Sequence, residues 1–141
     1  MQFKTIFVAA LTALRRRFDF VEMMPEPQRL GEVDGINLAQ MLQSINKRIE
    51  HLYDRDHTIG HAYLMSSTSL IDLNQAFRRK IIPLLQEYFY EDWSKVKLVL
   101  NDSEGHFISA KTSTISGDDD SREIYGVKAT DFTLDAFRNI Y

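Results

Sequence analysis

The chain has 141 residues, of which 44% are hydrophobic and 26% charged, a composition typical of one soluble globular domain with its own core. Its formal net charge of -3 excludes the strongly basic field of a protein that binds nucleic acid over its whole surface, so we expect any contact with DNA to be indirect. The chain has no cysteine, which excludes disulfides and thiolate metal sites and fits a reducing, cytoplasmic location.

An apolar run from Thr5 to Leu14 superficially resembles a signal peptide, but three arginines follow it instead of preceding it. The run is also much shorter than the roughly 20 residues that cross a bilayer, so we expect no membrane span. Residues 5–17 are predicted to form a short helix, and residues 18–22, which alternate apolar and acidic, a short buried strand.

Apolar side chains recur at helical spacing from Asn37 to Arg55, with Asn37 as a plausible N-cap. A second helix is predicted from Leu70 to Tyr90. Pro83 should kink or restart this helix, because proline removes a backbone donor and clashes with the preceding turn. The segment 91–100 is predicted to be a third helical segment. It places Trp93, Val96, Val99 and Leu100 inward, and Asn101 closes it.

The last forty residues differ in character from the helical part. Residues 105–109 are predicted to form a strand, and residues 112–122 a polar, acidic loop that contains Asp118, Asp119 and Asp120. A short helix is predicted over 132–141, with five anchors: Phe132, Leu134, Phe137, Ile140 and Tyr141. The acidic run lacks the spacing of a calcium-binding loop, which favours a solvated loop over a metal site.

Arg15, Arg16 and Arg17 are adjacent at the end of the first apolar run. Arginine presents a planar fork of donors that matches phosphate oxygens, and at a subunit boundary it can reach the terminal phosphate bound by a neighbour. The alternative is a solvated helix end, where cations are favoured near the C-terminus. On residue types alone the second interpretation is the more common one.

The string Arg55-Asp56-His57-Thr58-Ile59-Gly60-His61-Ala62-Tyr63 holds two histidines four residues apart. They could bind metal from one face of a helix, but Gly60 argues against a regular helix and no third ligand is evident. His61 could instead contact a nucleotide, or serve as a structural histidine. The sequence has no G-x-x-x-x-G-K-[ST] phosphate loop, so we expect no nucleotide hydrolysis by this chain alone.

Three strings in one order, spanning about residues 11–101, resemble the AAA+ motor subunit of McrBC-type, modification-dependent restriction systems. The segment 13–22 resembles the family's A-L-R-R-R-F string and the strand after it. The segment 55–63 is similar to its I-G-H-[SA]-Y lid motif. The segment 77–93 resembles its I-x-P-L-L-x-E-Y-F-x-[DE]-D string.

The resemblance implies a mainly α (α+β) chain: a remnant of the α/β AAA+ core in residues 1–22, a helical AAA+ lid in 23–101, and a C-terminal extension with short strands and a terminal helix in 102–141. It implies that Arg15 and Arg16 act in trans on the nucleotide of a neighbouring subunit. The role of Arg17 is less certain. Gly60 and His61 then match the lid motif on the nucleotide side.

The family's motor hydrolyses GTP, or ATP in some relatives, with Mg²⁺. It forms a ring of identical subunits and drives a McrC-like nuclease along DNA. Because residues 1–10 do not reproduce the family's M-N-T-x-D-R signature, the chain is expected to be a truncated piece that supplies arginines and binds no cofactor alone. The alternatives are a non-catalytic helical interaction module derived from such a lid, and an unrelated small helical protein.

Overall fold

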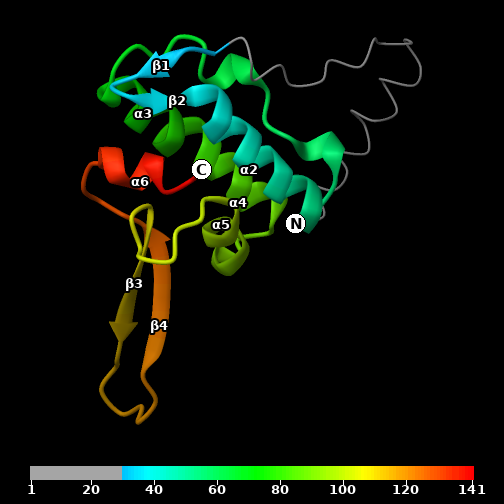
Figure 1. Cartoon of the computed structure of the whole chain (residues 1–141). Coiled ribbons are helices and arrows are strands. Elements are labelled where there is room, and N and C mark those ends of the chain that lie inside the picture. The colour runs from blue at the N-terminus through cyan, green and yellow to red at the C-terminus, as the bar shows by residue number, and fades with distance from the viewer. Residues whose placement is uncertain (1–29) are drawn as a thin grey trace.

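The computed structural model describes residues 30–141. The described part is mainly helical with two small two-stranded sheets, which confirms the predicted fold class. Figure 1 shows a helical body from which one β-hairpin extends. The helix and strand predicted for residues 5–22 lie outside the described residues.

A tight hairpin that the sequence analysis did not predict precedes the first described helix. Strands β1 (Glu32–Val33) and β2 (Ile36–Asn37) pair antiparallel across Asp34 and Gly35. Both turn residues have positive φ, 49° and 83°, as a two-residue turn of this hand requires. The Asp34 carboxylate also accepts a hydrogen bond from the backbone N–H of Leu70 at 3.1 Å, which connects the hairpin to the helix that begins at Leu70.

Helix α2 (Leu38–Leu52) is the helix predicted over 37–55, and it ends three residues earlier than predicted. Asn37 is its N-cap, as predicted, and the Asn37 side chain accepts from the backbone N–H of Gln40 at 3.1 Å. Its buried stripe consists of Leu38, Met41, Leu42, Ile45, Asn46 and Ile49. Its apolar members lie at the helical spacing predicted from the sequence, whereas its polar member, Asn46, was not predicted.

The predicted interruption near Pro83 takes the form of a wide turn. Helix α3 (Leu70–Ala76) runs into a π-helical turn, η4 (Phe77–Ile81), which continues as α4 (Ile82–Tyr88). The Ile82 N–H donates to the Phe77 carbonyl, five residues back. Pro83, which lacks an N–H, is the second residue of α4 and directly follows this wider bond.

The two helix ends that follow use left-handed residues other than glycine. After α4, Tyr90 and Glu91 have φ of 51° and 62°, so the helix ends at Tyr88 and not at the predicted Tyr90. Helix α5 (Trp93–Val99) ends with Asn101 at φ 50°, and the Asp102 N–H returns to the Lys97 carbonyl at 2.9 Å. Asn101 therefore closes α5 as predicted.

The C-terminal extension contains a hairpin and one short helix. The predicted strand over 105–109 is displaced: β3 spans Ile108–Ser113, because Gly105 turns the chain at φ 78° just before it. β3 pairs antiparallel with β4 (Arg122–Val127), a strand that the sequence analysis missed, so the loop between them is shorter than predicted and spans 114–121. Helix α6 (Leu134–Arg138) lies within the predicted 132–141 segment.

The extension and the helices share one hydrophobic core. Phe107 stacks on Phe77 of the wide turn, with ring centroids 5.6 Å apart, and Phe137 meets the same ring edge-on at 5.0 Å. Phe132, Phe137 and Ile140 are buried as predicted, and Leu134 is half-buried. Tyr141 is 39% exposed, and its hydroxyl accepts a hydrogen bond from the Asn37 backbone N–H at 3.0 Å. The boundary predicted at 101/102 stays a prediction, but no gap in the core separates its two sides.

Candidate functional site

The segment between α2 and α3 consists of two single helical turns. Asp54 caps the first turn, η2 (Arg55–His57), and accepts from the His57 backbone N–H at 2.9 Å. Gly60 stands at the start of the second turn, η3 (His61–Tyr63), in extended conformation. Since the two turns are separate, His57 and His61 do not share the face of one regular helix, and the described residues contain no group of three metal ligands.

One buried side chain fixes the position of this segment. The Asn46 side chain donates to the Ile59 carbonyl at 2.9 Å and accepts from the Ile59 backbone N–H at 2.6 Å. Both residues are buried, so the pair is shielded from competing water. Residues 60 and 61 follow directly and are therefore held in a defined place at the edge of the helical body.

Gly60 and His61, the two lid residues named from the sequence, lie between two buried anchors, Ile59 and Leu64. Gly60 has φ -71°, which every residue adopts, and a Cβ built on it meets no atom of residues 30–141 within 4 Å. Neither backbone strain nor crowding by the described residues therefore requires glycine here. His61 is half-buried, and its carbonyl accepts from the Leu64 N–H at 3.0 Å.

An aromatic cluster that the sequence analysis missed lies beside this segment. The His57 ring lies 4.0 Å from the Tyr53 ring and 4.9 Å from the Tyr88 ring, measured between centroids. The Asp54 carboxylate holds His57 Nδ1 at 2.6 Å. Burial raises the pKa of Tyr88 to about 12 and also raises the pKa of Tyr53. The cluster is built from α2, η2 and α4, so spacing along the chain could not reveal it.

The predicted trans-acting arginines, Arg15, Arg16 and Arg17, lie outside the described residues, so their role stays a prediction. Asp118, Asp119 and Asp120 lie in the loop that closes the β3–β4 hairpin, and the three side chains are exposed. Within residues 30–141, no helix is long and apolar enough to cross a membrane.

Comparison with known families identifies the helical part of the chain. Residues 37–97 match the family model described as McrB, alpha-helical lid domain. This stretch begins at the N-cap of α2, contains the Ile59-Gly60-His61 string and ends within α5. A search of curated proteins finds no match.

Proposed function

Because residues 37–97 form a McrB-type helical lid domain, which relates the chain to the McrB AAA+ NTPase of restriction systems, we propose that the chain is the lid portion of an AAA+ motor. The motor hydrolyses GTP or ATP and drives a partner nuclease in the restriction of modified DNA. The observation that carries the proposal is the placement of Gly60 and His61, which the Asn46–Ile59 pair fixes, with no described atom within 4 Å of a Cβ added at Gly60.

The chemistry of these two residues suits a nucleotide-facing edge. No described atom lies within 4 Å of a Cβ built on Gly60, so the described residues leave room for another backbone or a phosphate to approach closely. An imidazole can donate or accept a hydrogen bond, and its charge depends on its surroundings. The hydrogen bonds between Asn46 and Ile59 already fix the segment that carries Gly60 and His61, so less conformational entropy is lost when a ligand binds.

In the complete module, Mg²⁺ and the AAA+ core hold the nucleotide, and the lid completes the site. Arg15 and Arg16 of this chain reach the nucleotide of the neighbouring subunit, where a fixed positive charge stabilises the transferring phosphoryl group. We expect Arg16→Ala to abolish hydrolysis in the complete module while nucleotide binding persists, because a trans-acting arginine acts on the transition state.

The partners follow from the same proposal. They are further AAA+ subunits in a ring and a McrC-like nuclease, while DNA is contacted through the assembly and not by the lid itself. The net charge of -3 agrees with this indirect relation to DNA.

The test joins the chain to a McrB-type AAA+ core that carries its own phosphate loop but no lid. We expect no GTP or ATP hydrolysis by the chain alone and hydrolysis by the joined protein, which His61→Ala and Gly60→Ala both reduce. The matched control is Gly126→Ala on β4, where a Cβ likewise meets none of the described atoms within 4 Å and φ is not positive.

Three results would count against the proposal. They are turnover by the chain alone, a joined protein that folds and binds nucleotide without hydrolysing it, and equal effects of the Gly60 and Gly126 substitutions. The second result would favour a non-catalytic interaction module.

A further inference from the structure

A surface groove of about 720 Å³ runs between α2 and α5. Lys47, Arg48 and His51 line its α2 side, and their spacing of three and four residues puts them on one face of the helix. Arg48 is fixed there by a bond from its guanidinium to the Val99 carbonyl at 3.0 Å. The other side is formed by Leu98 and Asn101. We call this the basic groove.

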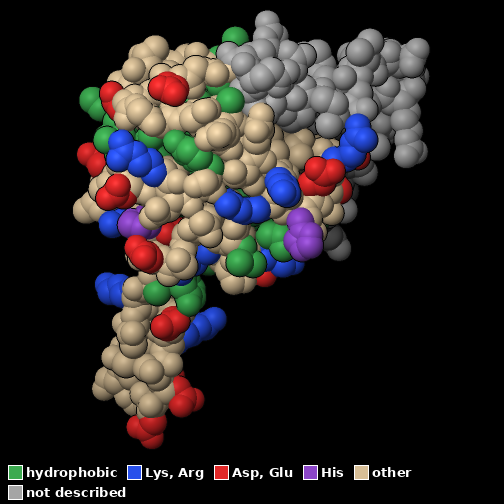
Figure 2. Space-filling view, in the orientation of Figure 1, with side chains coloured by type: hydrophobic (Ala, Val, Ile, Leu, Met, Phe, Trp, Pro, Cys, Tyr) green, Lys and Arg blue, Asp and Glu red, His purple; other side chains and the backbone are tan. Residues whose placement is uncertain are grey.

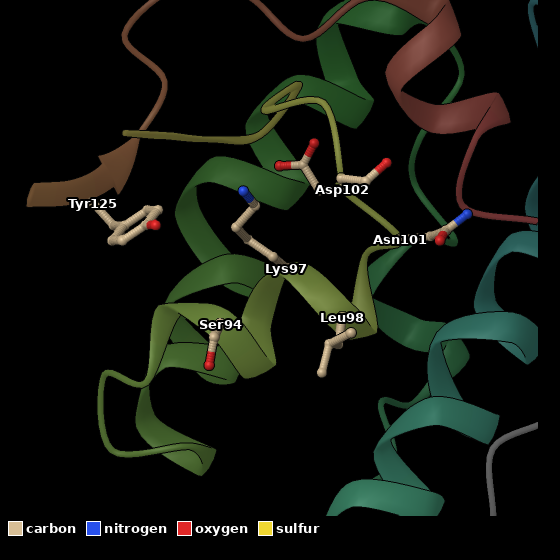
Figure 3. A pocket seen from close by; sticks show the side chains of 7 residues that line it. Ser94, Lys97, Leu98, Asn101, Asp102 and Tyr125 are labelled. Atoms are coloured by element: carbon tan, nitrogen blue, oxygen red, sulfur yellow. The ribbon is translucent and has the colours of Figure 1, made fainter. Parts of the chain in front are cut away.

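Leu98 stands on the border of the basic groove with 59% of its surface exposed. Beyond it lies a second hollow of about 390 Å³, which Leu98 and Asn101 also line and to which Lys97 and Tyr125 contribute (Figure 3). Lys97 Nζ lies 5.6 Å from the centre of the Tyr125 ring. An exposed apolar side chain with cations on both sides fits a partner that presents an apolar group next to carboxylates.

The tip of the β3–β4 hairpin has that composition. Residues 114–121 contain three aspartates and no cation, and Ile115 is 68% exposed. The Asp118 N–H donates to the Ile115 carbonyl at 3.2 Å across a turn in which Gly117 has φ 94°. This turn brings the isoleucine and the aspartates together.

The tip does not lie in the basic groove of its own chain. Six paired residues in each strand extend about 20 Å from the body, and Figure 1 shows the hairpin pointing away from α2. Figure 2 shows acidic side chains at the far end of the hairpin, and both basic and acidic ones over the body. Most residues of both strands are exposed or half-buried on both faces, and a two-stranded hairpin of this kind is marginal in water without a partner surface.

We propose that the hairpin tip of one copy docks in the basic groove of a second copy, with Ile115 against Leu98 and the aspartates against Lys47 and Arg48. The contact joins two different surfaces, so copies associate head to tail and each adds a free tip and a free groove. It goes beyond the role proposed for the lid in hydrolysis, and it needs no nucleotide.

The test measures self-association of the full chain by sedimentation velocity without nucleotide, at low and high salt. Lys47→Glu and Asp119→Lys should each weaken association about tenfold or more, because each places like charges opposite one another. The two substitutions in one chain should restore association, since the charge pair is rebuilt in reverse. High salt should weaken the wild-type contact.

The controls make the same charge changes at exposed sites elsewhere. Lys80→Glu on the wide turn and Asp131→Lys before α6 should leave association unchanged. A wild-type chain that stays monomeric at every concentration overturns the proposal, as does a double variant no better than the single ones, or a control equal to its test variant. A Lys47→Glu variant that associates as before also overturns it. If that variant has lost binding to a single-stranded oligonucleotide, the occupant of the basic groove is nucleic acid and not a second copy. Because nucleotide is absent throughout, each of these failures leaves the hydrolysis proposal standing.

Discussion

Asn46 and Asn74 make the same pair of bonds in two regions of the molecule. The Asn46 side chain accepts from the backbone N–H of Ile59 and donates to the Ile59 carbonyl. The Asn74 side chain accepts from the Phe132 N–H at 2.6 Å and donates to the Phe132 carbonyl at 3.0 Å. The first pair fixes the segment that carries Gly60 and His61. The second fixes the start of α6. In each case one buried amide on a helix positions a distant segment that has little regular structure of its own.

The two regions differ in what else holds them. The segment bound by Asn74 is also held by Arg78, which donates to the Lys128 and Thr130 carbonyls and lies over the Phe132 ring. Phe132 and Phe137 of this segment both pack against Phe107. The segment gripped by Asn46 has Ile59 and Leu64 as its buried apolar anchors. The comparison shows that the extension is part of the core, while the Gly60 segment, within the described residues, is anchored in it chiefly by Ile59 and Leu64.

The largest effect is expected at Phe107, where the extension joins the aromatic core. Phe107→Ala should lower the free energy of unfolding by about 3–5 kcal/mol, because the substitution leaves a cavity against Phe77, Phe132 and Phe137. Urea denaturation should show one transition at a lower midpoint. Two separate transitions would mean that the extension folds independently of the helices and would break the comparison.

Asn74→Ala and Asn46→Ala should each cost about 2–3 kcal/mol, since each leaves buried backbone groups without partners. Their local consequences should differ. Hydrogen exchange should accelerate around residues 132–140 in the first variant and around 57–63 in the second. Equal acceleration in both regions for both variants would contradict the assignment of one segment to each asparagine.

The half-buried Tyr88, beside the Gly60 segment, should make the stability of the protein depend on pH in the alkaline range. Its pKa of about 12 in the folded protein exceeds the value near 10 of an exposed tyrosine, so its contribution to stability is complete below about pH 10 and is lost as pH rises towards 12. Tyr88→Phe should flatten this alkaline loss in chemical denaturation measured from about pH 8 to 12. An unchanged slope would show that Tyr88 is not the group responsible.

Gly60→Ala should have the smallest effect on folding. An added methyl meets no described atom and φ is ordinary, so stability should stay the same or rise by up to about 1 kcal/mol as the unfolded chain loses freedom. Thermal denaturation of the chain alone measures this. A clear loss of stability would mean that the glycine is needed for folding and would weaken the functional reading of this position.

The helical framework could be predicted from the sequence because apolar spacing reports directly on buried faces. The stripe of α2 was predicted in this way. Its cap at Asn37 and the close of α5 at Asn101 were predicted from the preference of asparagine for helix ends. The family of the helical part was also recovered, from the order of short strings that each carried little information.

The asparagine hydrogen bonds and strand β4 could not be predicted, because they depend on contacts between residues distant in sequence. Asn46 is 13 residues from Ile59, and Asn74 is 58 residues from Phe132. Contacts at such separations produce no periodic pattern in the sequence. Strand β4 was missed because its glycine and charged residues do not alternate cleanly, and only pairing with β3 defines it. The β1–β2 hairpin was missed although Asp34-Gly35 is a strong two-residue turn signal.

The central claim is that the Gly60 and His61 segment faces the nucleotide. Its most direct test is the amide and imidazole NMR spectrum of the chain joined to a McrB-type core, recorded with and without a slowly hydrolysed Mg²⁺–nucleotide. The resonances of Gly60 and His61 should shift on nucleotide binding, and that of Gly126 should not. Nucleotide binding that leaves both lid resonances in place would contradict the claim.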